Sequence, residues 1–475
     1  MGLLKHELPY HHDSALLFER IATQAWAMFL DSGQMLNPLT GKPGSQYGCY
    51  DILVAEPFIT LVTQGNITTI VQNGQAEVSQ EDPFLLLKNC LNQYKTPKTD
   101  LPFSGESLPF SGGALGYFAY DLARRIETLP SNAIPVVELP EMMIGIYDWA
   151  VIIDHREQKS MLVSRGCNEA TLHHWPRLQA LFDEPYKIIP NTFKVKSITE
   201  ANLTKAQYSQ AFNTIQAYIQ AGDCYQVNLA QRLSATVEGD SWNAYKTLRE
   251  ISPAPFMAFM QLPLNENERF QVLSNSPERF IQINGNHVET RPIKGTRPRF
   301  KDPEQDLNSA NELLTSLKDH AENVMIVDLL RNDLSKSCEK VSVTKLFQLQ
   351  SFANVHHLVS IIVGKLRLHK TAVDVLRSCF PGGSITGAPK LRAMQIIDEL
   401  EPHRRGLYCG AIGYIGFDGD MDTNIAIRTA VNCKNVLSFH AGGGIVADSD
   451  CSKEYTETLD KASSFTTIIT YFTRL

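Results

Sequence analysis

The sequence has 475 residues, with 44 basic and 51 acidic side chains and a formal net charge of −7, and 43% of it is hydrophobic. This is the composition of a globular protein of two or three domains, and it excludes a disordered or collagen-like chain. The sequence lacks the excess of basic residues that nucleic-acid binding usually requires, and no apolar run reaches the roughly 18 residues of a membrane span. Nine cysteines without a Cys-x-x-Cys pair favour reduced thiols, so we expect a cytoplasmic protein that binds neither nucleic acid nor membrane.

Residues 25–154 are predicted to form mainly β-structure. Short apolar segments, such as 52–54 and 151–153, are separated there by Gly, Pro, Asn and Asp. Residues 185–201 contain two prolines and no sustained hydrophobic period, which predicts a connector. The connector divides the sequence into an N-terminal region, 1–190, and a C-terminal region, 201–475.

The C-terminal region is predicted to begin with an amphipathic helix. Thr204 is a suitable N-cap, apolar residues then recur at a spacing of three to four, and Gly222 ends the pattern. Further helices are expected at 306–317, 322–330, 390–400 and 448–465, with strands at 270–274, 341–343 and 436–440 between them. Because strands and helices do not alternate in regular βαβ units, we predict an α+β fold. Large, mostly antiparallel sheets would pack as a sandwich with helices on the outside.

Two pairs of acidic residues have helical spacing. Glu454 and Glu457 share one helix face with Lys461, and Asp319 and Glu322 stand at i and i+3 near another helix start. Four carboxylates on two helices could hold one Mg²⁺ ion, which prefers oxygen ligands. The alternative is a solvated charged face with ordinary ion pairs, and spacing alone favours it.

Two glycine-rich segments could bring backbone close to a ligand. Residues 381–390 place glycines and hydroxyls before a helix, where free N–H groups can meet an anion, and residues 441–445 contain three consecutive glycines. Neither has the order of a Walker loop or of G-x-G-x-x-G, so a nucleotide cofactor is not expected. Each segment is equally compatible with a tight turn.

A lysine and a glutamate complete the candidate chemistry. Lys294 lies between Pro292 and Gly295 and beside arginines that lower its affinity for a proton, so it could act as a nucleophile. An exposed loop lysine is the commoner case, and a pyridoxal phosphate Schiff base is a further reading of the same residue. Glu278 lies 16 residues upstream and could act as a general acid.

Taken together, these segments stand in an order that resembles the chorismate-utilising enzymes. That family includes anthranilate synthase component I, isochorismate synthase and aminodeoxychorismate synthase component I. The resemblance covers the chain strongly from 204 onward and more loosely at 25–154, and it implies the fold of anthranilate synthase component I. It is carried by Ser276-Pro277-Glu278-Arg279, Ala321-Glu322, Val327-Asp328-Leu329-Leu330-Arg331-Asn332-Asp333, Gly387-Ala388-Pro389-Lys390 and Ala447-Asp448-Ser449-Asp450.

Two positions separate the activities of this family. Lys294 matches the lysine of aminodeoxychorismate synthases, where anthranilate synthases resemble the sequence but carry alanine, and Gln226 stands where isochorismate synthases place a lysine. The resemblance therefore implies conversion of chorismate and ammonia to 4-amino-4-deoxychorismate, for 4-aminobenzoate and folate biosynthesis. Anthranilate synthase component I is the alternative enzyme, and a silent amino-acid sensor on the same fold is the alternative class.

The resemblance also implies roles for individual residues. Glu278 would protonate the departing C4 hydroxyl, Lys294 would form a covalent adduct with the substrate, and His357 would lie near the ring. Substrate binding is implied for Thr386, Tyr408, Arg428, Gly444 and Lys461. Mg²⁺ would be held by Glu322 and Glu457 directly, and by Asp319 and Glu454 through water.

Two partners are implied as well. No cysteine has the Gly-x-Cys-x-Gly setting of a glutaminase, so ammonia would come from a separate glutamine amidotransferase subunit in a heterodimer. Leu30-Asp31-Ser32 resembles the segment with which the family binds tryptophan, and the alternative is an apolar contact without a ligand. The implied tryptophan pocket comprises Ser32, Tyr47, Gly48, Cys49, Tyr50, Pro255, Phe256 and Met257. Cys49 stands where a basic residue is common, and the loop from 33 to 47 is longer than usual.

Overall fold

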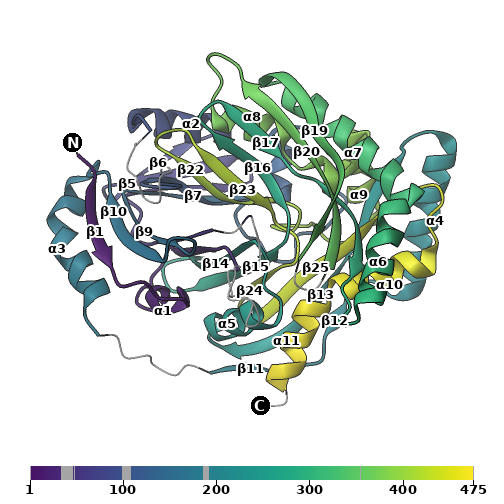
Figure 1. The fold of residues 1–475 in the computed structure, drawn as a ribbon, viewed down its shortest axis with the longest axis horizontal. Coiled ribbons are helices and arrows are strands. Elements are labelled where there is room, and N and C mark those ends of the chain that lie inside the picture. The colour runs from purple at the N-terminus through teal and green to yellow at the C-terminus, as the bar shows by residue number, and fades with distance from the viewer. Residues whose placement is uncertain are drawn as a thin grey trace.

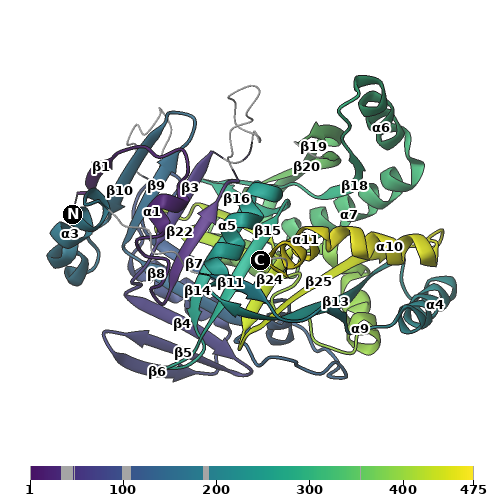
Figure 2. The same ribbon diagram turned by 90° about the horizontal axis from the view of Figure 1, so that it is seen from below.

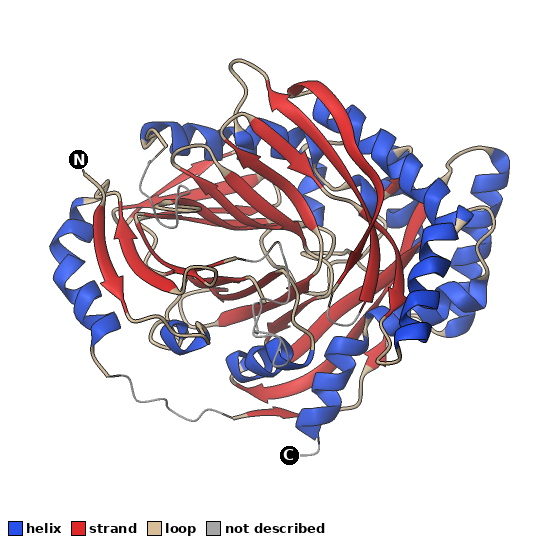
Figure 3. Ribbon diagram, viewed as in Figure 1, coloured by secondary structure: helices blue, strands red, loops and turns tan. Residues whose placement is uncertain are grey.

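Two large antiparallel sheets form the centre of the molecule (Figure 1). The computed structural model describes residues 2–33, 47, 49–98, 108–185, 192–352 and 355–473. Within these residues every pair of named strands is antiparallel, and one isolated parallel bridge joins Ile134 and His403. Figure 3 shows the strands in the interior and most helices around the outside. The predicted α+β architecture is confirmed.

The first sheet has thirteen strands among the described residues. In spatial order they are β1 (Leu4–Leu8), β10 (Lys159–Ser164), β9 (Trp149–Asp154), β3 (Tyr50–Val54), β2 (Ala27–Asp31), β14 (Phe256–Pro263), β15 (Arg269–Ser276), β24 (Thr429–Cys433), β25 (Val436–Ile445), β13 (Gln226–Gly239) and β11 (Phe193–Val195). The short strands β12 (Glu200–Ala201) and β21 (Gly387–Ala388) also pair with β13.

The second sheet has twelve strands in the same part of the chain. Their order is β18 (Ile293–Pro298), β20 (Val355–Leu366), β17 (His287–Thr290), β16 (Arg279–Asn284), β23 (Met421–Ile425), β22 (Ala411–Gly416), β7 (Gly113–Phe118), β8 (Met142–Tyr147), β4 (Ile59–Gln64), β5 (Ile67–Gln72) and β6 (Gln75–Ser79). The remaining strand, β19 (Cys338–Ser351), pairs with β20.

Helices cover the outer faces of both sheets (Figure 2). They are α1 (Ala15–Phe18), α2 (Pro83–Gln93), α3 (Glu169–Asp183), α4 (Lys205–Ala221), α5 (Ser241–Ile251), α6 (Pro303–Thr315), α7 (Leu317–Ser335), α8 (Ala372–Cys379), α9 (Lys390–Leu400), α10 (Cys451–Lys461) and α11 (Ser463–Thr473), with 3-10 turns η1 (Tyr120–Arg125) and η2 (Gly383–Ile385). None of the helices among the described residues combines the length and apolar character that crossing a lipid bilayer requires.

The apolar core lies in layers. Met260 and Val272 of the first sheet pack in one buried cluster with Leu115 and Tyr117 of the second, between the two sheets. A second cluster joins the first sheet to α1, α3, α5 and α11, and a third joins the second sheet to α2, α7, α8 and α9. Each sheet is therefore buried on both faces over much of its area, which explains the many wholly apolar strands.

The regions 1–190 and 201–475 both contribute to each sheet. β2 pairs with β14 in the first sheet, and β7 pairs with β22 in the second. The boundary between the regions is thus crossed by backbone hydrogen bonds in both sheets.

Most predicted elements are present with shifted ends. Thr204 caps α4 with a complete capping box, and Gly222 ends it in the left-handed conformation at φ 81°. The helix predicted at 448–465 is instead two helices that meet at Ala462. The connector interpretation of 185–201 was incomplete, because β11 and β12 form there and pair with β13.

Candidate active site

Glu278 lies in the two-residue turn between β15 and β16. The hydroxyl of Ser276 accepts the Glu278 backbone N–H at 3.3 Å and donates to the carbonyl of Ile425 at 2.6 Å, which fixes the turn. The hydroxyl of Ser384, in η2, donates to Oε1 of Glu278 at 2.9 Å. Burial raises the pKa of Glu278 to about 6, while the Ser384 hydrogen bond and the charge of Lys294 act in the opposite direction. A carboxyl with this pKa can donate a proton near neutral pH.

The side chain of Lys294, on β18, also reaches Ser384. Its Nζ donates to the backbone carbonyl of Ser384 at 3.2 Å. Its charge also favours the ionised forms of Glu278, Glu322 and Glu457, which come from three different elements. The predicted nucleophile and the predicted acid are therefore linked through one residue, Ser384.

His357 lies on β20 opposite Thr296 of β18. Its Nδ1 and the Thr296 hydroxyl are 2.9 Å apart. Burial, together with the charge of Arg428, lowers the pKa of His357 to about 3. The imidazole is therefore neutral at physiological pH and can exchange hydrogen bonds with a substrate without carrying charge.

Arg428 is held in an unusual backbone conformation. Its φ of 47° lies in the left-handed region, which is costly for a residue with a side chain, and its carbonyl accepts the Asn275 N–H at 2.8 Å. The guanidinium of this half-buried residue forms no hydrogen bond or ion pair with any described residue. An unpaired guanidinium in this setting suits an incoming carboxylate.

The other predicted substrate residues lie on the neighbouring strands and loops. Lys461 donates to the Gly442 carbonyl at 3.0 Å. Thr386 lies in the loop after η2, and its carbonyl accepts the Asn228 N–H at 2.9 Å. Gly444 leaves room for the side chain of Gln226, since an added Cβ would lie 2.5 Å from Nε2. Both polar atoms of that buried amide lack a partner among the described residues, so Gln226 also has capacity to bind a ligand.

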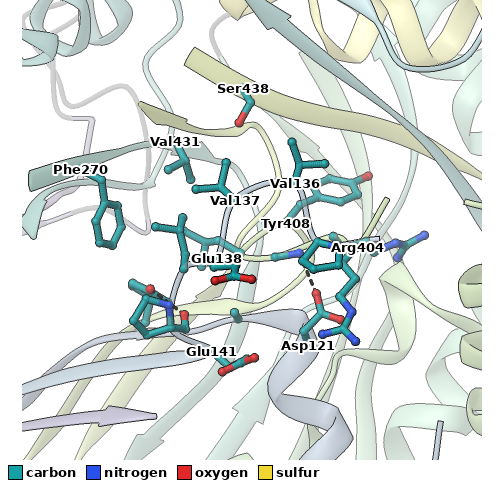
Figure 4. Close-up of a pocket in the computed structure, with 18 of the residues that line it drawn as sticks. Asp121, Val136, Val137, Glu138, Glu141, Phe270, Arg404, Tyr408, Val431 and Ser438 are labelled. Atoms are coloured by element: carbon teal, nitrogen blue, oxygen red, sulfur yellow. Dashed lines mark hydrogen bonds between the residues drawn. The ribbon is translucent and has the colours of Figure 1, made fainter. Parts of the chain in front are cut away.

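Tyr408 is set apart from this group. It is buried, and its ring stacks on His440 with a centroid distance of 5.2 Å. It also lines a separate cavity of about 360 Å³ between the two sheets (Figure 4). Through this stack Tyr408 contacts β25, the strand that carries Gly444.

The four predicted metal ligands lie on α7 and α10. Lys318 contacts Glu454 at 3.3 Å and Glu322 at 3.9 Å, and so joins the two helices. Asp319 instead pairs with Arg297 at 3.3 Å. In the described part of the chain no three His, Cys, Asp or Glu side chains are gathered as a metal ion requires.

Two of these carboxylates nevertheless leave room for a hard cation, which prefers oxygen ligands. A Cβ added to Gly443 would lie 3.2 Å from an oxygen of Glu454 and 3.5 Å from an oxygen of Glu457. The missing side chain leaves a cradle between these two acids. Burial raises the pKa of Glu322, while the charges of Lys294 and Lys318 act in the opposite direction.

The predicted tryptophan pocket is only partly assembled by described contacts. Asp31 pairs with Met257 across β2 and β14, so Ser32 lies beside the segment Pro255, Phe256 and Met257. The N–H and hydroxyl of Ser32 both donate to Asp51, at 2.7 and 2.6 Å. The ring of Tyr47 lies 4.5 Å from the Arg291 guanidinium. Tyr50 is the first residue of β3 and Cys49 directly precedes it, while Gly48 lies outside the described residues.

Comparison with known proteins places these residues in a family. The sequence profile described as chorismate binding enzyme matches residues 48–467. The chain belongs to the chorismate-binding enzyme family. Among curated relatives, it is 46% identical over 459 residues to aminodeoxychorismate synthase component 1 of Klebsiella aerogenes, which covers 96% of each chain. It is 37% identical to anthranilate synthase component 1 of Streptomyces coelicolor, over 82% of this chain and 77% of the relative.

A solved structure of the same family has the same fold. Anthranilate synthase component I from Streptococcus pneumoniae TIGR4 superposes with a TM-score of 0.72 at 31% identity, over 89% of this chain and 93% of that chain. The two antiparallel sheets and their helices are thus the fold of chorismate-binding enzymes.

Sequence reasoning missed some residues that position the site. Ser384 was part of a noted motif but received no role, although it contacts both Glu278 and Lys294. The buried pair Arg405 and Glu401 was also missed. Arg405 donates to the carbonyl of Ile385 at 3.1 Å and pairs with Glu401 at 2.6 Å, which ties η2 to the segment after α9 in this chorismate-binding enzyme. No motif marks the contacts of Ser384, because they join segments distant in sequence. Glu401 and Arg405 stand at i and i+4, so their spacing was the available signal.

Proposed function

We propose that this protein is the chorismate-converting component of an aminodeoxychorismate synthase, which forms 4-amino-4-deoxychorismate from chorismate and ammonia. The observation that carries the proposal is the position of Lys294 beside Ser384 and close to Glu278. Curated relatives with this activity in their names, 46, 45 and 44% identical over 96% of the chain, support it over the anthranilate alternative.

The proposed chemistry consists of two allylic displacements. The protonated carboxyl of Glu278 gives its proton to the C4 hydroxyl, which leaves as water while Nζ of Lys294, having released one proton to solvent, forms a bond to C2. Ammonia then forms a bond at C4, the double bonds shift back, and the lysine nitrogen leaves C2 as an amine. A proton released by the added ammonia returns the carboxyl of Glu278 to its starting state.

Substrate binding would rest on separate contacts for the two carboxylates. Arg428 would bind the enolpyruvyl carboxylate through its planar guanidinium, with Tyr408, Thr386, Gly444 and Lys461 completing that set. Glu322 and Glu457, with Asp319 and Glu454 behind them, would hold Mg²⁺, which when bound neutralises the ring carboxylate. His357 would face the ring as a neutral imidazole.

A mass experiment tests the role of Lys294. Protein incubated with chorismate and Mg²⁺, but without ammonia, is expected to gain the mass of chorismate less water on Lys294. Lys294→Ala should lose both the adduct and turnover, whereas Lys301→Ala, at an exposed lysine nearby, should keep both. Near-normal ammonia-dependent turnover in Lys294→Ala would contradict the nucleophile.

Product analysis tests the activity itself. With ammonium, chorismate and Mg²⁺ the product should be 4-amino-4-deoxychorismate without release of pyruvate. Formation of fluorescent 2-aminobenzoate with pyruvate would instead identify an anthranilate synthase. Omitting Mg²⁺ with a chelator present should stop turnover in either case.

We also propose that a glutamine amidotransferase subunit supplies the ammonia. The designation component 1 of the curated relatives supports a second component. The protein alone should use ammonium but not glutamine, and addition of the amidotransferase should make glutamine effective. Glutamine-dependent turnover by the purified chain alone would refute this partner.

Tryptophan binding and a cytoplasmic location complete the proposal. Tryptophan would bind beside Ser32 and Met257, and calorimetry that detects no heat of binding would reject this site.

No disulfide joins any of the nine cysteines, which supports a reducing compartment. Recovery of the protein from the cytoplasmic fraction of its host cells is the corresponding test.

A further inference from the structure

The cavity between the two sheets has features that the proposed reaction does not use (Figure 4). It holds about 360 Å³, within the range of small-molecule sites. Its apolar lining comes from both sheets and from the loops that close it: Tyr117, Val136, Val137, Leu139, Phe270, Leu407 and Val431. Such a lining suits the body of a small apolar or aromatic molecule.

Two unpartnered polar groups stand side by side on one wall. Arg232 of β13 is the direct cross-strand partner of His440 of β25, so both side chains leave the same face of the sheet. The Arg232 guanidinium is half-buried and forms no hydrogen bond or ion pair with any described residue. Nε2 of His440 is buried and has no hydrogen-bond partner among those residues either. A buried polar atom nearly always has a partner, so Nε2 of His440 calls for one from outside the chain. The Arg232 guanidinium beside it is available to the same molecule.

The acidic residues of the cavity do not neutralise Arg232. Asp121 accepts the Gly406 N–H at 2.8 Å and pairs with Arg124 at 3.1 Å. Glu141 accepts the Gly65 N–H at 2.8 Å. Both acids therefore have partners on the opposite wall, and Glu138 is solvent-exposed. Burial lowers the pKa of Arg232, as expected for a desolvated cation without a counterion.

We propose that this cavity is a second ligand site, for a small carboxylate with an apolar ring-sized body. The carboxylate would bind the Arg232 guanidinium and Nε2 of His440, and the body would lie against Phe270, Leu407 and Val431. The ring of Tyr408 stacks on His440, so a bound molecule would touch the back of one residue of the proposed substrate set. The site is distinct from the carboxylate contact at Arg428.

Binding of a matched probe pair tests the proposal. ¹⁹F NMR on the full-length protein, without chorismate, would measure the Kd of 4-fluorobenzoate and of neutral 4-fluorobenzamide. The benzoate is expected to bind about tenfold more tightly, because only it can form a charge-assisted pair with Arg232. Arg232→Gln should abolish this difference. Arg392→Gln, at a surface arginine paired with Asp223, should leave both Kd values unchanged.

A cavity-filling variant keeps the test independent of the charge. Ser438 lies on the wall two residues from His440, and Ser438→Leu should weaken binding of both probes while Arg232 remains. Thermal melting of each variant verifies folding. The proposal is overturned if neither probe binds, if both bind equally, or if the benzoate preference is lost in Arg428→Gln but kept in Arg232→Gln. None of these outcomes depends on turnover, so they are separate from the tests of the proposed function.

Discussion

Ser384 ties together the two groups on which the proposed chemistry depends. Its hydroxyl donates to Glu278, and its carbonyl accepts from Lys294. Burial is the main reason that the pKa of Glu278 is raised to about 6, and the Ser384 hydrogen bond limits that rise because it favours the ionised carboxylate. A rate that needs the protonated acid should therefore fall as pH increases above about 6.

In Ser384→Ala, the alkaline limb of the pH–rate profile, where the rate falls, should shift to higher pH. Loss of a hydrogen bond to the carboxylate raises the pKa further, by roughly 0.7 for a bond that contributes about 1 kcal/mol. The measurement is kcat/KM for chorismate against pH with ammonium as the nitrogen source. Ser378→Ala, whose hydroxyl bonds Ser337 away from the site, should leave the limb in place. An alkaline limb at the same pH or at a lower pH in Ser384→Ala would show that Glu278 is not the acid.

A second residue-scale network stabilises the fold beside the predicted tryptophan pocket. Asp51 is fully buried, and Nε2 of His155 lies 2.8 Å from its carboxylate. Burial acts to raise the pKa of Asp51, but His155 and the hydroxyls of Ser14 and Ser32 outweigh it and lower the pKa. Burial acts to lower the pKa of His155, and Asp51 outweighs it and raises that pKa.

The stabilisation from this pair should be confined to a window of pH. The stabilisation from ionised Asp51 is present above the ordinary Asp pKa of about 3.9 and is lost on acidification. The stabilisation from protonated His155 is lost as pH rises through the raised pKa of His155, above about 6.5. At pH 6, Asp51→Asn should lower the free energy of unfolding by about 3 kcal/mol in urea denaturation. Asp183→Asn, which breaks the more exposed pair with His6, should cost less than about 1 kcal/mol. Equal costs for the two variants would contradict the assignment.

At the scale of elements, β25 positions the carboxylates of α10. Three consecutive glycines near its end meet different neighbours: a Cβ at Gly442 would lie 2.6 Å from the Leu229 carbonyl, and one at Gly443 would point between Glu454 and Glu457. Gly442 is therefore required by backbone packing, while Gly443 keeps space open between two acids.

Gly443→Ala should test that space directly. The added methyl group would lie in the cradle proposed for Mg²⁺ without a backbone clash, so the fold should be retained. The Mg²⁺ concentration for half-maximal turnover is expected to rise about tenfold, a loss of roughly 1.4 kcal/mol in binding. An unchanged Mg²⁺ requirement, with an unchanged melting temperature, would place the ion elsewhere.

At the scale of the molecule, the regions 1–190 and 201–475 share both sheets. β14 packs against β2, and β22 against β7, so separation of the regions would open an edge in each sheet. It would also divide the cluster that contains Phe29 and Phe259, whose side chains both pack on Phe18.

A fragment of residues 192–475 should therefore not fold alone. It is expected to lack a cooperative thermal transition and the near-ultraviolet circular dichroism of the full chain. Co-expression with residues 1–191 should restore both signals, because the missing strands can pair again. A cooperative melt of the isolated fragment would show that the C-terminal region is an independent domain.

The sequence alone determined the fold class, the boundaries of α4 and the family. Local signals suffice there: Thr204 and Gly222 have conformational preferences that act within one helix, and long motifs keep their order along the chain. α2 illustrates a signal that was overlooked, because Asp82 caps it and Pro83 occupies its first turn. The break at Ala462 was not predicted, because the apolar pattern runs through both helices.

Only the tertiary structure decided which of these residues meet. The contacts of Ser384 with Glu278 and Lys294, the link from Lys318 to Glu454, and the unpartnered pair of Arg232 and His440 all join segments distant in sequence. Residue type and spacing describe one helix face or one strand at a time. Burial, the pKa of Glu278 and the shape of a cavity depend instead on how two sheets pack together, and no local pattern in the sequence records that packing.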